Sequence, residues 1–161
     1  QKRDWQMGTA QLDLVMLPKQ FELSYTDEDG SKKMPWVIHR AIFGSFERFI
    51  GILLEETGGN LPVWLAPTQA MVVSISEKSA DYAAGIAEKL RAADVRARTD
   101  NRSETLNKKI RDAEMLKVPY ILVVGPKEAE SKTVNVRERG TDAQKSLSLD
   151  DFNAFVRKQL P

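Results

Sequence analysis

Arg48 and Ser45 are the residues whose types and spacing most directly suggest chemistry. Both lie where an apolar strand passes through a Gly-Ser pair into a predicted helix. A planar guanidinium held beside the end of a strand can stack on a flat ligand and hydrogen-bond to it. The helix dipole disfavours an Arg in the first turn, so helix stabilisation does not account for this residue. A solvated Arg without a ligand is the alternative interpretation.

Two predicted elements position these side chains. The apolar strand Trp36-Val37-Ile38 ends at His39-Arg40, and Gly44-Ser45 then supplies a flexible turn and an N-cap. The helix begins at Phe46 and closes at Gly58-Gly59, which is a C-cap signal. Its apolar residues recur at the spacing of a helix face that packs against a core, namely Phe46, Phe49, Ile50, Leu53 and Leu54.

The run from His39 to Phe49, His-Arg-Ala-Ile-Phe-Gly-Ser-Phe-Glu-Arg-Phe, resembles motif 3 of class II aminoacyl-tRNA synthetases, specifically of the threonyl-tRNA synthetase family. Residues 6–13 resemble the preceding active-site strand of that family, and residues 61–67 resemble its passage into the anticodon-binding domain. The resemblance implies that Arg48 is a catalytic residue that stacks on the adenine of ATP. It also implies that Gln6, Gln11 and Ser45 contact the nucleotide or line its site.

His39 is the only histidine. A single His at a strand end is typical of a structural hydrogen-bonding residue, and a catalytic zinc usually needs three protein ligands. The family resemblance implies a different role, because threonyl-tRNA synthetases bind a Zn²⁺ ion that selects threonine, and His39 matches one of its ligands. The other two ligands, a Cys and a His, would lie upstream of residue 1. We therefore expect this chain alone not to hold zinc tightly, and we expect Mg²⁺ to accompany ATP.

Composition indicates a globular chain. It has 161 residues, of which 42% are hydrophobic and 29% are charged, and its net charge is +1. Such a balanced charge does not by itself indicate nucleic-acid binding, so any RNA contact needs a local basic patch. The chain has no Cys and no apolar run near the roughly 20 residues of a membrane span, so we expect a cytoplasmic protein without a membrane partner. The sequence begins with Gln1 and not with an initiator Met, and strand-like sequence follows at once. We therefore expect the chain to be a fragment of a longer protein.

The sequence predicts two parts that divide at 61/62. Residues 1–61 are expected to form a partial antiparallel α+β remnant of a catalytic domain, with a hairpin over 20–38. Residues 62–161 alternate apolar strands with amphipathic helices, which predicts an α/β domain with a parallel or mixed sheet and helices on its faces. Strands are expected at 70–75, 95–99, 120–124 and 133–139, and helices from Ser76 or Ser79 to Ala93, from Leu106 to Leu116 and from Leu149 to Leu160.

Basic residues recur through this second part. Acidic residues interleave with them, so a solvated surface is the alternative to a patch that binds RNA. The segments 110–128 and 134–140 resemble the anticodon-binding core of threonyl-tRNA synthetases. Ser103 and Lys117 depart from that family pattern, and Lys cannot make the bidentate contact of an Arg. The tRNA anticodon contacts that the resemblance implies are Arg111, Lys117, Glu128 and Arg137.

The leading hypothesis is therefore the C-terminal part of a threonine–tRNA ligase. The full-length enzyme would be a homodimer that activates threonine with ATP and transfers it to tRNA(Thr), whereas this part alone is expected to be inactive. One alternative is a prolyl-type class II synthetase, against which His39 argues. Two others are a non-catalytic, synthetase-like subunit that binds nucleic acid and a purely structural domain.

Overall fold

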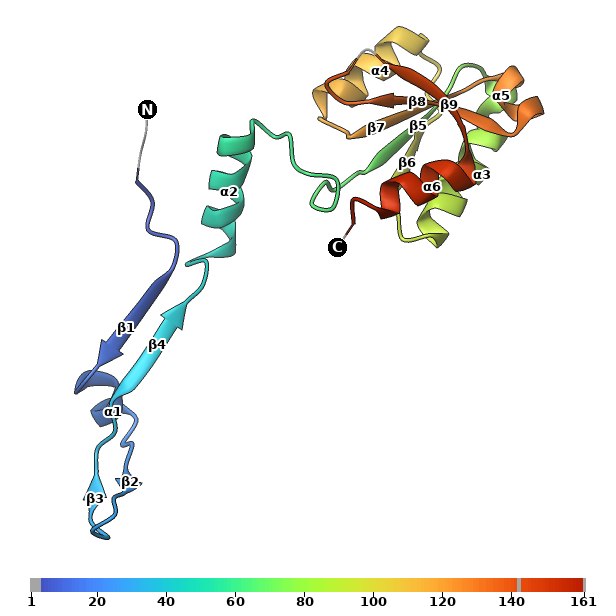
Figure 1. Ribbon diagram of the computed structural model, residues 1–161. Coiled ribbons are helices and arrows are strands. Elements are labelled where there is room, and N and C mark those ends of the chain that lie inside the picture. The colour runs from blue at the N-terminus through green and yellow to red at the C-terminus, as the bar shows by residue number, and fades with distance from the viewer. Residues whose placement is uncertain (1–3, 142, 161) are drawn as a thin grey trace. The chain divides into compact units, whose positions relative to one another are not determined.

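The computed structural model describes residues 4–141 and 143–160, so residues 1–3, which begin the expected catalytic part, lie outside it. The chain divides into two compact units, Gln1–Glu56 and Thr57–Pro161 (Figure 1).

The first unit is built on one antiparallel strand pair. β1 (Thr9–Asp13) pairs with β4 (Val37–Ala41), so that Gln11 lies opposite His39. Between them come α1 (Met16–Gln20) and two short strands that pair with each other, β2 (Tyr25–Thr26) and β3 (Lys32–Lys33). The predicted hairpin is therefore present but shorter than expected, since Phe21 precedes its first strand and β4 begins at Val37. α1 was not predicted.

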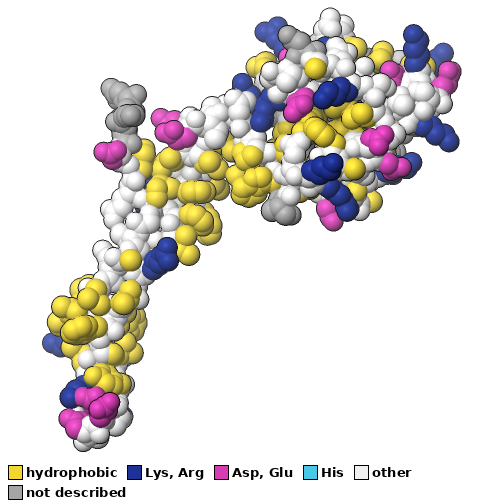
Figure 2. All heavy atoms as spheres, in the orientation of Figure 1, with side chains coloured by type: hydrophobic (Ala, Val, Ile, Leu, Met, Phe, Trp, Pro, Cys, Tyr) yellow, Lys and Arg dark blue, Asp and Glu magenta, His cyan; other side chains and the backbone are white. Residues whose placement is uncertain are grey.

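The helix α2 (Phe46–Thr57) follows β4 as the sequence predicts. Ser45 caps it, because its Oγ accepts a hydrogen bond from the Arg48 backbone N–H at 3.2 Å. The prediction that the apolar face of α2 packs against a core is wrong for the described residues. The helix buries no residue, and the side chains of Phe46 and Ile50 are 70% and 51% exposed. Figure 2 shows hydrophobic side chains gathered over this unit. Within the described residues, the two strand pairs of this unit are too small to cover these side chains.

The second unit confirms the predicted α/β fold. Its five-stranded sheet has the order β6-β5-β7-β8-β9 and consists of β5 (Ala70–Ser74), β6 (Ala97–Asp100), β7 (Tyr120–Val124), β8 (Thr133–Glu138) and β9 (Gln144–Ser148). β5 pairs in parallel with β6 and β7, whereas the β7–β8 and β8–β9 pairs are antiparallel. All five residues of β7 are buried, as expected for a strand covered on both faces.

Helices cover both faces of this sheet. α3 (Ala80–Ala92) and α6 (Leu149–Arg157) pack on one face, where Leu90 and Phe152 join the main core. α4 (Leu106–Met115) packs on the other face through Ile110 and Ala113. A short 3₁₀ turn, η1 (Glu77–Ser79), precedes α3, and α5 (Pro126–Ser131) follows β7.

Several details of the second unit differ from the prediction. α4 ends at Met115, so Leu116 is 70% exposed and does not face the core as expected. The chain turns there because Lys117 adopts a left-handed backbone conformation with φ of 57°. The sequence also failed to predict α5 and β9, since both are short and neither carries a clear apolar period.

Candidate functional site

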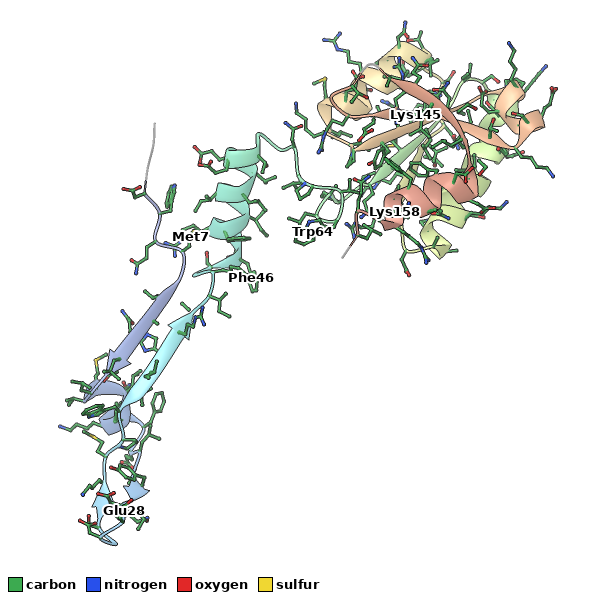
Figure 3. All side chains as sticks on the ribbon, in the orientation of Figure 1. Met7, Glu28, Phe46, Trp64, Lys145 and Lys158 are labelled. Carbon is green, nitrogen blue, oxygen red and sulfur yellow. The ribbon has the colours of Figure 1, made fainter. Side chains whose placement is uncertain are left out.

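In the first unit, the turn before α2 brings the predicted nucleotide-binding residues together. Gly44 has φ of +71°, and a Cβ built on it would lie 2.7 Å from Arg48 Nη2 and 3.3 Å from the Met7 carbonyl oxygen. The Arg48 guanidinium therefore folds back over the turn, and the segment that carries Gln6 runs beside it. Figure 3 labels Met7 and Phe46, which belong to these two segments. Gln6, Ser45 and Arg48 are all exposed, so a flat ligand could reach them.

Gln11 and His39 occupy a second part of the first unit. They lie opposite each other in the β1–β4 ladder, so their side chains share one face, and both line an open groove of about 580 Å³. His39 is exposed. Within the described part of the chain, no three His, Cys, Asp or Glu side chains are grouped to hold a metal ion. His39 can therefore supply one ligand at most, and these residues alone do not make a zinc site.

The second unit contains a basic pocket of about 380 Å³. It lies where the end of α4 meets β8, and its cationic lining residues are Lys117, Arg137 and Arg139. Arg137 lies opposite Ile121 in the β7–β8 ladder, which places it on the face of the sheet that α4 covers. Glu114 and Glu138 also line the pocket. Lysine and arginine beside carboxylates can pair with phosphate and also hydrogen-bond to the edges of unpaired bases.

The four predicted anticodon residues are not all in this pocket. Lys117 and Arg137 line it together. Arg111 is exposed on α4, three residues before the pocket residue Glu114, so these two side chains are neighbours on the helix surface. Glu128 lies beyond the other end of β7, where its carboxylate accepts a hydrogen bond from the Gly125 N–H at 2.9 Å. Burial together with this carboxylate raises the pKa of Tyr82.

A charged network that the sequence did not predict fixes the loop before α4. Arg102 donates to both carboxylate oxygens of Asp100, at 2.9 and 2.7 Å, and to Asp112 at 2.8 Å. The hydrogen bonds from Arg102 to Asp100 lower the pKa of this buried carboxyl. Lys109 is 3% exposed and donates from Nζ to the Ser74 carbonyl oxygen at 3.0 Å, which fastens α4 to the end of β5. The network thereby orients the helix that carries Arg111.

Glu114 is a pocket residue that the sequence did not single out, whereas the sequence indicated Arg139 only as one of the recurring basic residues. Glu114 belongs to no recognisable chemical motif, so the only signal in the sequence that it lies near the predicted RNA contacts is its position one helical turn after Arg111. The sequence predicts that Arg139 shares a strand face with Arg137, but it does not indicate that Arg139 has a structural role. Its backbone N–H donates to the Pro119 carbonyl oxygen at 2.8 Å, immediately beyond the end of β8.

Comparisons with known protein families explain this combination of units. A family model described as "Anticodon binding domain" matches residues 69–159, which cover the sheet, α3, α4, α6 and every lining residue of the basic pocket except Asn60. The chain belongs to the anticodon binding domain family. A second model, "tRNA synthetase class II core domain (G, H, P, S and T)", matches residues 1–57, which cover the strand pair and α2. An anticodon binding domain thus follows part of a class II synthetase core in the sequence.

Proteins with similar sequences along nearly the whole chain are threonine–tRNA ligases. The chain is 49% identical over 156 residues to one from Sulfurihydrogenibium and 54% identical over 149 residues to one from Caulobacter. The alignments cover 97% and 92% of the chain but only 24% and 22% of these relatives, so the chain spans about a quarter of their length. The predicted resemblance to the C-terminal part of threonyl-tRNA synthetase is confirmed.

Solved structures support the same relationship. The RNA binding domain of threonyl-tRNA synthetase from Cryptosporidium parvum superposes with a TM-score of 0.86 and 42% identity, over 99% of this chain and 40% of that one. A prolyl-tRNA synthetase from the same organism has a TM-score of 0.75 at 23% identity, over 94% of this chain and 33% of that one, which indicates a shared fold. Among residues 4–141 and 143–160, no helix is both long and apolar enough to cross a membrane.

Proposed function

We propose that this chain serves a threonine–tRNA ligase, in which residues 1–61 supply motif 3 of the active site and residues 62–161 bind the anticodon of tRNA(Thr). The observation that carries the proposal is the similarity to threonine–tRNA ligases along nearly the whole chain, including both units. The full-length protein would activate threonine with ATP, transfer it to tRNA(Thr) and act as a homodimer in the cytoplasm.

The first unit would bind the adenine end of ATP. Arg48 would stack on the base, because its guanidinium is planar and lies beside the Gly44 turn. Ser45 and Gln6 lie on the two segments that meet there, and Gln11 would line the adjoining site from β1. Mg²⁺ would accompany the nucleotide phosphates and balance their charge. His39 would contribute one of several zinc ligands in the full-length protein, and we derive no step through that ion.

The second unit would read the anticodon. Lys117 and Arg137 would contact the RNA inside the basic pocket, and Arg111 would extend the contact along α4. Unpaired loop bases expose their hydrogen-bonding edges, and an Arg fork can donate two parallel hydrogen bonds to such an edge. Glu128 would accept hydrogen bonds from a base only if the RNA reaches the far end of β7.

The experiment that tests the proposal compares two RNAs. One is the anticodon stem-loop of a threonine-accepting tRNA, and the other is the same stem-loop with its anticodon changed. We expect the matched RNA to bind more tightly by more than ~1 kcal/mol, the scale of one good base contact. Equal binding of both RNAs would indicate a domain that recognises only the phosphate backbone, and no binding by either would favour a structural domain.

A further inference from the structure

Arg139 connects the basic pocket to the segment of chain that enters the second unit. Its Nη1 donates to the Lys117 carbonyl oxygen at 2.6 Å, and its Nη2 donates to the Leu61 carbonyl oxygen at 2.7 Å. One planar guanidinium thus holds two backbone segments 56 residues apart in the sequence. Because its two terminal nitrogens have a fixed separation, the fork also fixes the separation of these segments.

The segment 61–66, which we call the strap, is fastened to the second unit by side chains. Gln69 is fully buried and donates from Nε2 to the Val63 carbonyl oxygen at 3.0 Å. Arg96 donates to the carbonyl oxygens of Trp64 and Ala66 at 2.6 and 3.0 Å. Trp64 itself projects from the strap in Figure 3. Arg139 therefore makes the first of several such attachments, at the point where the strap begins.

The residues just before the strap belong to the pocket. Asn60 lines the pocket together with Lys117 and Arg137. Gly59 is close to the same wall, because a Cβ built on it would lie 3.5 Å from Lys117 Cγ. A ligand in the pocket would therefore touch one wall formed by Asn60, the residue just before the strap, and another formed by Lys117. Because Arg139 binds the carbonyl oxygens of Leu61 and Lys117, it sets the distance between these walls.

We propose that Arg139 is a positioning residue that couples RNA binding in the basic pocket to the strap. This inference rests on the proposed function of the pocket. RNA that contacts Lys117 and Arg137 restrains the backbone at Lys117, whose carbonyl oxygen accepts a hydrogen bond from Arg139. Because the same guanidinium donates to the Leu61 carbonyl oxygen, the restraint extends to the start of the strap. The strap follows α2 in the sequence, so it is the covalent path from the pocket toward the first unit.

The test measures amide hydrogen exchange in the strap with and without the matched anticodon stem-loop. Leu65 and Ala66 are suitable reporters, because their N–H groups donate to the Pro62 carbonyl oxygen at 3.0 and 3.1 Å. In the unmodified chain we expect RNA to slow their exchange. In Arg139→Lys, which keeps the charge but loses the fork, we expect this slowing to disappear and RNA affinity to fall about 5-fold, the lower end of typical couplings between sites.

Arg96→Lys is the matched control, since it loosens the other end of the strap without touching the pocket. We expect it to speed strap exchange in the free chain while leaving RNA affinity unchanged within 2-fold, on the order of a surface substitution. A second variant, Arg139→Gln, removes both the charge and the fork and should lose the slowing as well. If Arg139→Gln unfolds the chain, Arg139→Lys still decides the question. Anticodon-dependent binding without any strap response would overturn the coupling alone. Absence of anticodon-dependent binding in the unmodified chain would overturn both the coupling and the proposed function.

Discussion

Phe152→Ala is expected to lower the free energy of unfolding of the second unit by about 3–5 kcal/mol, the usual cost of deleting a buried aromatic ring. Phe152 is 0% exposed on α6, and its ring packs edge-on against Tyr120 with centroids 5.5 Å apart. The substitution leaves a cavity in the main core between α6 and β7. It also removes a favourable aromatic contact.

Urea unfolding followed by circular dichroism measures this loss. Met115→Ala is the control, because Met115 is 71% exposed at the end of α4 and its truncation should change stability by only about 0.5 kcal/mol. If Phe152→Ala and Met115→Ala cost the same free energy, α6 does not pack on the sheet as described.

Arg137→Ala is expected to reduce the preference for the matched anticodon by about 1–3 kcal/mol, the scale on which one bidentate base contact discriminates. Arg137 lies on the α4 face of β8 and lines the basic pocket. Its removal takes away an Arg fork that can donate to a base edge. Competition binding with the matched and altered stem-loops gives the change in preference directly.

Arg157→Ala separates base contacts from net charge. Arg157 is exposed in the last turn of α6, on the opposite face of the sheet, so this variant loses the same charge without touching the pocket. Both variants should lose some salt-dependent affinity for phosphate, but Arg157→Ala should keep the anticodon preference. Equal loss of preference in the two variants would argue against base recognition by Arg137.

Local sequence signals predicted the parts of the fold that depend on short-range chemistry. The unbroken apolar run Tyr120–Val124 became a fully buried central strand, and Ser45 caps α2 through its hydroxyl. The alternation in β1 placed Gln11 on the face that His39 shares. In each case the spacing of residues along a single element decides the outcome.

Features that depend on distant partners were not predictable in this way. The apolar face of α2 has the period of a buried helix, yet Phe46 remains exposed because the described residues of its unit offer nothing large enough to cover it. By its residue type Arg139 would be expected to be a solvated surface cation, yet its guanidinium donates hydrogen bonds to carbonyl oxygens 22 and 78 residues away in the sequence. Lys109 similarly follows the polar pattern of α4 but is buried against Ser74.

A map of where the matched anticodon stem-loop binds would test whether the basic pocket reads the anticodon, and changes in the backbone amide chemical shifts of the isotope-labelled chain give such a map. We expect the largest changes around the basic pocket, at Arg111, Lys117 and Arg137. The altered stem-loop should produce weaker changes at the same amides. Changes confined to α3 and α6, or identical maps for the two RNAs, would contradict the claim that this pocket reads the anticodon.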